Sequence, residues 1–397
     1  MRMPTEFDAA SFVEKAVEEL RRRIGDRRAI IAVSGGVDST TCAALTYRAI
    51  GRNLVCVFID TGFMRKGEPE EVYRRLTAPP LNLPLKLIRA KDRFFKALKG
   101  LSDAEQKRMA FRKTFYEVLS EEARKEECTV LVQGTIAPDW IETLGGIKTQ
   151  HNILEQLGVD TAKEYGFDLV EPLVDLYKDQ VRAVARYLGA PVEVSERQPF
   201  PGPGLSVRAI GEITEEKVEV AREANWIVEE KLKEFKPSQY FAAVFEDERI
   251  DLDRHLKQEI AGVLKLSEDE LQLYCFKARA TGVKEDARAY GKIVGLECWR
   301  RLEDRVDVDL FDMAVKRLVH RDPEVTRVLC AVTERRHGKY AVAIRAVMTR
   351  DFMTAKVARL PWEVLIEVGK KILERCHTVS QVFYDVTSKP PATVEFE

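Results

Sequence analysis

The most chemically specific segment of the sequence is Ser34–Ser39, which reads SGGVDS between an apolar run and a helical pattern. Gly35 and Gly36 permit a sharp turn in which the main chain can come close to a ligand. Ser34 and Ser39 supply hydroxyl groups, and the helix that follows adds free N–H groups and the positive end of its dipole. This combination predicts a site that grips a pyrophosphate group.

Asp38 lies inside the same turn, where its carboxylate would repel a phosphate unless a cation lay between them. We therefore expect a Mg²⁺ ion with Asp38 as a ligand. No lysine follows the glycines in the pattern G-x-x-x-x-G-K-[ST], so this is not a γ-phosphoryl transfer loop of the kinase or GTPase type. The simpler interpretation is a glycine-rich turn in which Asp38 only caps the helix, but the combined pattern is more specific than that.

Alternating strand and helix patterns in the first half position this turn. The expected strands are Ala29–Val33, Leu54–Asp60, Leu85–Arg89, Val130–Gln133 and Leu169–Val170, and the expected helices are Glu70–Leu76, Asp103–Lys125 and Lys178–Leu188. This order predicts an α/β fold with a doubly wound parallel sheet. Ligands bind outside the carboxyl ends of such strands, so Ser34–Ser39 should meet the turns Asp60–Gly62 and Gln133–Thr135 at one pocket.

The proline- and glycine-rich stretch Arg197–Arg208 predicts a domain boundary, because no helix or strand can run through it. We expect one domain over residues 1–200 and a second over residues 201–397. In the second half, long charged helical segments such as Glu212–Phe235 alternate with strand-like runs such as Ala341–Val347. That pattern is typical of an α+β domain.

Composition narrows the function classes. The sequence holds 64 Lys and Arg against 65 Asp and Glu, and this balance indicates neither a nucleic-acid nor a membrane surface. The N-terminal residues lack an apolar leader and no later run reaches membrane-spanning length, so we expect a cytoplasmic protein. The seven cysteines form no C-x-x-C pair and lie mostly in apolar runs, as core residues of a reducing compartment do.

Six segments together resemble the GMP synthetase family, and within it the ATP-pyrophosphatase subunit. They are SGGVDS, FIDTGFMR, VQGTIAPDWIETLGGIKTQHN, EPLVDLYKDQVR, PFPGPGL and the closing KPPATVEFE. The resemblance implies a PP-loop domain of the adenine nucleotide α-hydrolase-like class, followed by a smaller α+β domain used in dimerisation. It is weakest at about 247–325, where we expect an insertion.

The resemblance also implies the reaction, a ligase step of purine biosynthesis in which XMP, ATP and ammonia give GMP, AMP and pyrophosphate. The expected catalytic residues are Asp38, Lys148 and Thr135. Asp38 would act through Mg²⁺, and Lys148 would close over the phosphates from a glycine-rich segment. Thr135 would lie at the mouth of the pocket. His151 in the segment of Lys148 could also donate to a phosphate, although loop histidines are more often simply solvated.

The nucleotide-binding residues follow from the same motifs. Those expected to bind ATP are Ser34, Gly35, Gly36, Val37, Asp38, Ser39 and Thr40. Those expected to bind XMP are Arg208, Gln239, Lys389, Val394 and Glu395. In this assignment Lys389 suits the XMP phosphate, and Glu395 with the backbone at Val394 suits the purine. Composition alone would make the closing segment a proline-stiffened tail.

The sequence departs from the usual two-domain enzyme, since no cysteine lies in the setting of a glutaminase nucleophile. Ammonia is therefore expected free or from a separate glutamine amidotransferase subunit, and a homodimer is expected. One alternative is an ATP pyrophosphatase that acts on another acceptor such as tRNA, which generally needs paired cysteines or a metal cluster and a basic surface. The other is a non-catalytic protein that senses XMP and ATP.

Overall fold

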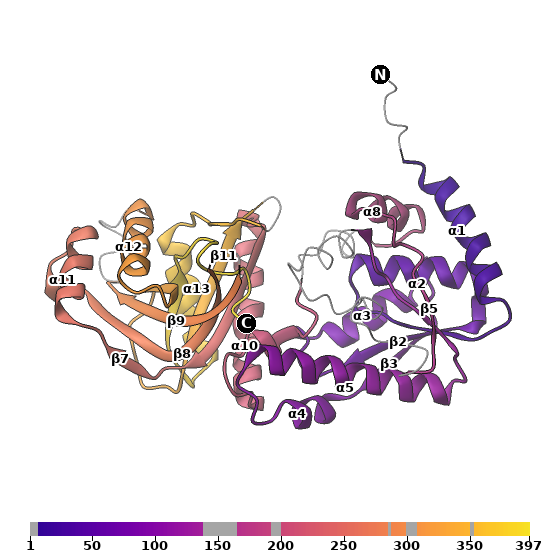
Figure 1. The fold of residues 1–397 in the computed structure, drawn as a ribbon, viewed down its shortest axis with the longest axis horizontal. Coiled ribbons are helices and arrows are strands. Elements are labelled where there is room, and N and C mark those ends of the chain that lie inside the picture. Colours follow the sequence, from indigo (N-terminus) through magenta and orange to yellow (C-terminus); the bar gives the residue numbers. More distant parts are fainter. Residues whose placement is uncertain (1–6, 138–164, 192–199, 285–286, 299–307, 350–352) are drawn as a thin grey trace, which may run out of the picture. The chain divides into compact units, whose positions relative to one another are not determined.

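The structure is a computed structural model that describes residues 7–137, 165–191, 200–284, 287–298, 308–349 and 353–397. The chain divides into two compact units of similar length (Figure 1). The first comprises Met1–Ala97 with Met109–Gly202, and the second comprises Leu98–Arg108 with Pro203–Glu397. Each unit has its own sheet and its own apolar core.

The first unit is built on a five-stranded parallel sheet in the order β3-β2-β1-β4-β5. Its strands are β1 (Ala29–Ala32), β2 (Leu54–Asp60), β3 (Leu85–Arg89), β4 (Val130–Val132) and β5 (Asp168–Val170). Its helices are α1 (Ala9–Ile24), α2 (Val37–Ile50), α3 (Glu68–Thr77), α4 (Lys91–Leu98), α8 (Lys178–Tyr187) and the greater part of α5 (Ala104–Lys125). The start of α5, up to Arg108, belongs to the second unit. The expected doubly wound parallel sheet is confirmed.

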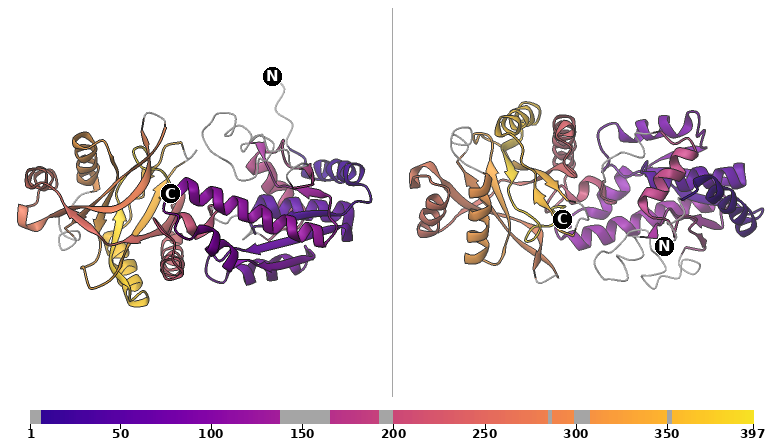
Figure 2. Two further views of the ribbon diagram at one scale, coloured as in Figure 1. Left: turned by 60° about the horizontal axis from the view of Figure 1, so that its bottom comes forward. Right: turned by 90° about the horizontal axis from the view of Figure 1, so that it is seen from above.

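Helices cover both faces of this sheet (Figure 2). Alternate residues of β1 separate the two faces: Ala29 and Ile31 belong to the apolar cluster that also contains buried residues of α1, α2, α3 and α8. On the opposite face α4 and α5 pack together, with the rings of Phe94 and Phe111 4.7 Å apart. Strands buried on both sides need apolar residues at every position, which explains the continuous apolar run of β2.

The second unit contains an eight-stranded mixed sheet in the order β12-β11-β13-β10-β9-β8-β7, with β6 paired to β11. Its strands are β6 (Gln239–Glu246), β7 (Arg249–Asp251), β8 (Gln272–Lys284), β9 (Ala287–Glu297), β10 (Val325–Ala331), β11 (Tyr340–Met348), β12 (Lys356–Val357) and β13 (Val379–Asp385). Its helices are α10 (Glu215–Leu232), α11 (Arg254–Val263), α12 (Val308–Arg321) and α13 (Trp362–Arg375).

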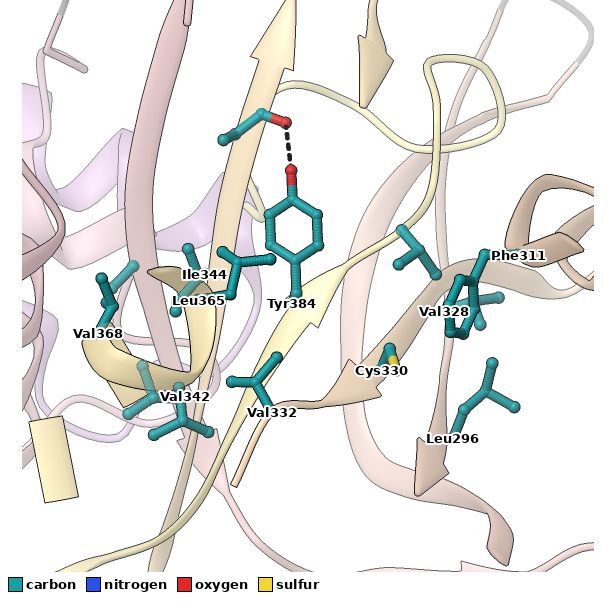
Figure 3. Packing of buried hydrophobic residues seen from close by; sticks show 14 of the residues in the cluster. Leu296, Phe311, Val328, Cys330, Val332, Val342, Ile344, Leu365, Val368 and Tyr384 are labelled. Carbon is teal, nitrogen blue, oxygen red and sulfur yellow. Dashed lines mark hydrogen bonds between the residues drawn. The ribbon is translucent and has the colours of Figure 1, made fainter. Parts of the chain in front are cut away.

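All four of these helices contribute to one apolar cluster with one face of the sheet. Figure 3 shows part of this cluster, with Phe311 of α12 and Leu365 of α13. Tyr384 is a polar member of this core, and its hydroxyl donates to the backbone carbonyl of Ala358 at 2.6 Å. The other face carries a second apolar cluster that includes Phe241, Phe383 and Phe396 from the closing segment. One face of the sheet is therefore covered by helices, and the other packs against the closing segment.

The stretch at about 247–325 forms β7, α11, β8, β9 and α12. It continues the sheet of the second unit, because β9 pairs in parallel with β10 and places Val294 opposite Val328. Within the described ranges, no helix is both long and apolar enough to cross a membrane.

Candidate active site

Polar groups follow the carboxyl ends of several strands of the parallel sheet. The turn Ser34–Ser39 comes after β1, Asp60 ends β2, Gln133–Thr135 follow β4, and Glu171 follows β5. Because all five strands run in the same direction, these groups lie at one edge of the sheet.

The turn after β1 packs closely against Val72, and hydrogen bonds of its own serines stabilise its conformation. Gly35 has a φ of +79°, and a Cβ on it would lie 2.6 Å from a methyl group of Val72. The Ser39 hydroxyl accepts the N–H of Ser34 at 3.1 Å and lies 3.0 Å from the Ser34 hydroxyl. Gly36 caps α2 without a side-chain hydrogen bond, so Asp38 is not the cap of this helix.

Asp38 forms an ion pair with a lysine from a distant helix. Its Oδ2 lies 2.5 Å from Nζ of Lys178, the first residue of α8, whereas its Oδ1 is buried and accepts no hydrogen bond from the described residues. Among the described residues no group of three or more His, Cys, Asp or Glu could hold a metal ion.

The loop after β4 packs directly on this turn. A Cβ on Gly134 would come within 3.1 Å of the Asp38 carbonyl oxygen. Thr135 is wholly buried, and its hydroxyl donates to the carboxylate of Glu171. Gln133 donates from Nε2 to the Tyr116 hydroxyl at 3.2 Å. The predicted residue Thr135 thus lies at the same edge as Asp38, with its hydroxyl group paired to a carboxylate.

Lys148, which was predicted to close over the phosphates, and His151, a candidate phosphate donor, lie outside the described residues. Lys178 and Glu171 were not predicted as site residues, although both belong to the motif EPLVDLYKDQVR. Their positions in the sequence could have indicated both residues, because Glu171 follows a strand of the parallel sheet and Lys178 begins the next helix.

In the second unit, three of the predicted XMP-binding residues form one cluster on the face that packs against the closing segment. The guanidinium of Arg208 is wholly buried and makes two hydrogen bonds with Glu395, at 3.1 Å from Nε and 2.9 Å from Nη2. Gln239 donates to the same carboxylate at 2.7 Å. Arg208 also donates to Asn225 at 2.9 Å and lies over the ring of Phe241.

A second cluster of buried charged residues anchors Thr393, two residues before Glu395. Asp385 accepts from Arg327 at 2.8 Å and pairs with Arg345 at 3.0 Å. Arg327 also donates to the Thr393 hydroxyl at 2.8 Å, and Arg345 donates to the Thr393 carbonyl at 3.0 Å. Burial lowers the pKa of Arg327 to about 10. Arg327 and Arg345 each lie in a strand of mainly apolar, buried residues. A charged residue inside such a strand is the sequence feature that could have indicated this cluster.

The other two predicted XMP residues lie in the same closing segment. The main chain of Lys389 bonds to that of Ala355 in both directions, at 2.8 and 3.2 Å. Val394 is partly buried and precedes Glu395 directly. All five predicted XMP residues therefore lie in the second unit, and at least three of them share one hydrogen-bonded cluster.

The parallel sheet and its SGGVDS turn define a PP-loop ATP pyrophosphatase, an enzyme class that uses ATP, and a family model described as a PP-loop domain matches residues 9–191. A second model, described as the GMP synthase C terminal domain, matches residues 326–396.

Whole-chain comparison narrows the class. The chain is 49% identical over 391 residues to a subunit of the glutamine-hydrolyzing GMP synthase of Saccharolobus solfataricus, covering 98% of this chain and 100% of that protein. It is 44% identical to the protein of the same description from Methanopyrus kandleri and 41% to that from Methanocaldococcus jannaschii, with the same coverage. The chain belongs to this family of GMP synthase subunits. Its function is that of the family, the ATP-dependent amination of XMP to GMP by a ligase.

Proposed function

We propose that the chain makes GMP in two steps, adenylation of XMP and then amination. In the first step the C2 carbonyl oxygen of XMP bonds to the α-phosphorus of ATP, and the bond from that phosphorus to pyrophosphate breaks. In the second, ammonia attacks C2, and AMP leaves with the former carbonyl oxygen. The SGGVDS turn supports this proposal most directly, since it suits a leaving pyrophosphate rather than a transferred γ-phosphoryl group.

The turn Ser34–Ser39 would grip the β- and γ-phosphates. The hydroxyls of Ser34 and Ser39 lie side by side, and the first N–H groups of α2, those of residues 37–39, precede the first hydrogen bond of the helix, from Thr40 to Gly36. These donors, with the dipole of α2, would hold the negative charge that builds on pyrophosphate as it leaves. The remaining predicted ATP residue, Thr40, has a buried hydroxyl without a hydrogen-bond partner among the described residues.

Asp38 would hold Mg²⁺. The fit rests on its buried Oδ1, which accepts no hydrogen bond from the described part of the chain and is a hard oxygen ligand of the kind that Mg²⁺ prefers. When bound, the ion would neutralise charge on the pyrophosphate. The Lys178 ammonium, which lies beside Oδ2 of the same carboxylate, would donate to a phosphate oxygen. We also assign phosphate contacts to Lys148, and Thr135 would fix the loop after β4.

Arg208, Gln239 and Glu395 would bind the purine of XMP, with Val394 contributing its backbone. Arg208 and Gln239 hold the Glu395 carboxylate in place, so it is ready to accept from the N–H edge of the base. Lys389 would neutralise the XMP phosphate.

We also propose that the chain works in the cytoplasm as a homodimer and receives ammonia from a separate glutaminase subunit. Each of the relatives is described as one subunit of a glutamine-hydrolyzing GMP synthase, and this description implies another subunit. All seven cysteines are buried, and none of them could serve as an accessible nucleophile for glutamine in this structure.

Pyrophosphate release by the purified chain with MgATP, XMP and ammonium, and with each component omitted, tests the reaction. We expect release that requires XMP, and GMP only when ammonium is present. Release without XMP, or only with added tRNA, would mean another acceptor. Binding of XMP and ATP without release would mean a sensing protein.

A further inference from the structure

The side chain of Glu397, two residues beyond Glu395, is buried in an ion pair. Its carboxylate contacts the ammonium of Lys107, which lies near the start of α5. It also accepts the N–H of Gly211 and the hydroxyl of Tyr290, both at 3.0 Å. Both members of the ion pair have side chains with no exposed area.

Lys107 is wholly buried, so its charge is compensated entirely inside the protein. It donates to the carbonyls of Ala209 and Gly211, both at 3.1 Å, and to that of Ser206 at 3.3 Å. Burial lowers the pKa of Lys107 and raises that of Glu397, which is the cost of removing both charges from water. A buried charge persists only where it is paired, so the two side chains depend on each other.

Before the ion pair, main-chain hydrogen bonds fix the closing segment on β8. The N–H of Val283 donates to the carbonyl of Pro391 at 2.7 Å, and that of Thr281 donates to the carbonyl of Phe396 at 2.8 Å. The ring of Phe396 is wholly buried. Glu395 therefore lies between two anchored points of the closing segment, at Pro391 and at Phe396. The ion pair of Glu397 adds a charged contact directly after the second point.

We propose that Lys107 is a positioning residue for XMP: through Glu397 it holds the closing segment so that Val394 and Glu395 present one fixed surface to the purine. This inference rests on the proposed function of those two residues. Neither Lys107 nor Glu397 touches the substrate in this scheme. Their effect is on XMP binding, because a segment that is already ordered does not lose conformational freedom when XMP binds.

Lys217 is a matched control in the same unit. It is also wholly buried, donates to the carbonyls of Ile210 at 2.8 Å and Glu212 at 2.6 Å, and pairs with Glu246 at 2.6 Å. The carbonyls of residues 209–212 thus alternate between Lys107 and Lys217. Of the two lysines, only Lys107 contacts the closing segment within the described residues.

The test compares Lys107→Met, Glu397→Gln and Lys217→Met with the wild-type chain in the pyrophosphate-release assay. We expect Lys107→Met and Glu397→Gln to raise the KM for XMP by about tenfold or more, with the KM for ATP and kcat within about twofold of wild type. Lys217→Met should leave the KM for XMP unchanged, although it also removes a buried charge. The double variant Lys107→Met/Glu397→Gln should be no worse than the worse single variant, since both changes break one contact.

An unchanged KM for XMP in folded Glu397→Gln overturns the proposal, as does an equal rise in Lys217→Met, which would trace the effect to residues 209–212. Glu397→Gln keeps an acceptor for Gly211 and Tyr290, so it provides the test if Lys107→Met does not fold. Failure of the proposed function is distinct from either result, because it would appear as wild-type protein that releases no pyrophosphate in response to XMP.

Discussion

The ammonium of Lys178 lies 2.5 Å from Oδ2 of Asp38, although 140 positions separate the two residues in the sequence. The pair joins the first turn of α2 to the first residue of α8, at the edge of the sheet where the SGGVDS turn lies. The carboxylate presents one oxygen to a lysine and leaves the other buried without a donor from the described residues. Asp38 thus has an oxygen available for a second cation while the lysine remains nearby.

Asp38→Asn should lower pyrophosphate release by about 100-fold or more, because an amide is a much poorer ligand for Mg²⁺ than a carboxylate. XMP binding, measured by calorimetry, should be unchanged, since Arg208 and Glu395 lie in the second unit. Asp168→Asn is the control, because Asp168 pairs with Arg27 at an exposed position. A variant at Asp38 that kept most of its activity would exclude it as the metal ligand.

Lys178→Met should lower kcat by about tenfold or more, because the phosphates lose a cation as charge builds on them. Lys178→Arg should lose less, since it keeps the charge but not the compact ammonium. Steady-state kinetics with saturating ATP and XMP measure both. If Lys178→Met were as active as the wild type, the lysine would only neutralise Asp38 and would not act on the phosphates.

Gly35→Ala should weaken ATP binding and destabilise the first unit by more than the backbone strain alone. Alanine at a φ of +79° costs about 1 kcal/mol, and here its Cβ would also meet Val72 at 2.6 Å. Gly67→Ala isolates the strain, because Gly67 has a left-handed φ of +67° with nothing within 4 Å of an added Cβ. Denaturant unfolding and ATP titration compare the two variants. Similar losses in both would mean that contact with Val72 is unimportant.

The sequence predicted the parallel sheet well because its signals are local. The apolar runs Leu54–Asp60 and Leu85–Arg89 match β2 and β3 at both ends, while β1 stops at Ala32, one residue short of the expected Val33. The SGGVDS turn is equally local, since its conformation depends on neighbouring glycines and serines.

The unpredicted features depend on residues far apart in the sequence. Lys107 occupies a position that would be solvated on an isolated amphipathic helix, and only the fold shows that it is buried. Arg327 and Arg345 meet at Asp385 because β10 and β11 both neighbour β13. Neither composition nor periodicity reports which strands are neighbours in a sheet.

Stability should fall at alkaline pH through Cys56. Burial raises the pKa of this thiol from its ordinary value of 9.0 to about 12. The unfolded chain therefore releases this proton more readily than the folded one, and the stabilisation present below pH 9 is lost as the pH rises toward 12. Between about pH 8 and about pH 10.5 this thiol alone should lower the free energy of unfolding by about 2 kcal/mol. Cys56→Ala should show a correspondingly smaller decrease in denaturant unfolding, and an identical decrease would contradict the assignment.

Arg208→Met should raise the KM for XMP by about tenfold or more and leave the KM for ATP unchanged. The Glu395 carboxylate would lose both hydrogen bonds from the guanidinium and keep the one from Gln239, so it would no longer be fixed. Loss of a buried ion pair also costs about 3 kcal/mol of stability, and a control must carry the same penalty. Arg249→Met does so, because Arg249 is nearly buried and pairs with Asp247 at 2.5 Å. If both variants raised the KM for XMP equally, the effect would come from the stability of the unit and not from the position of Glu395.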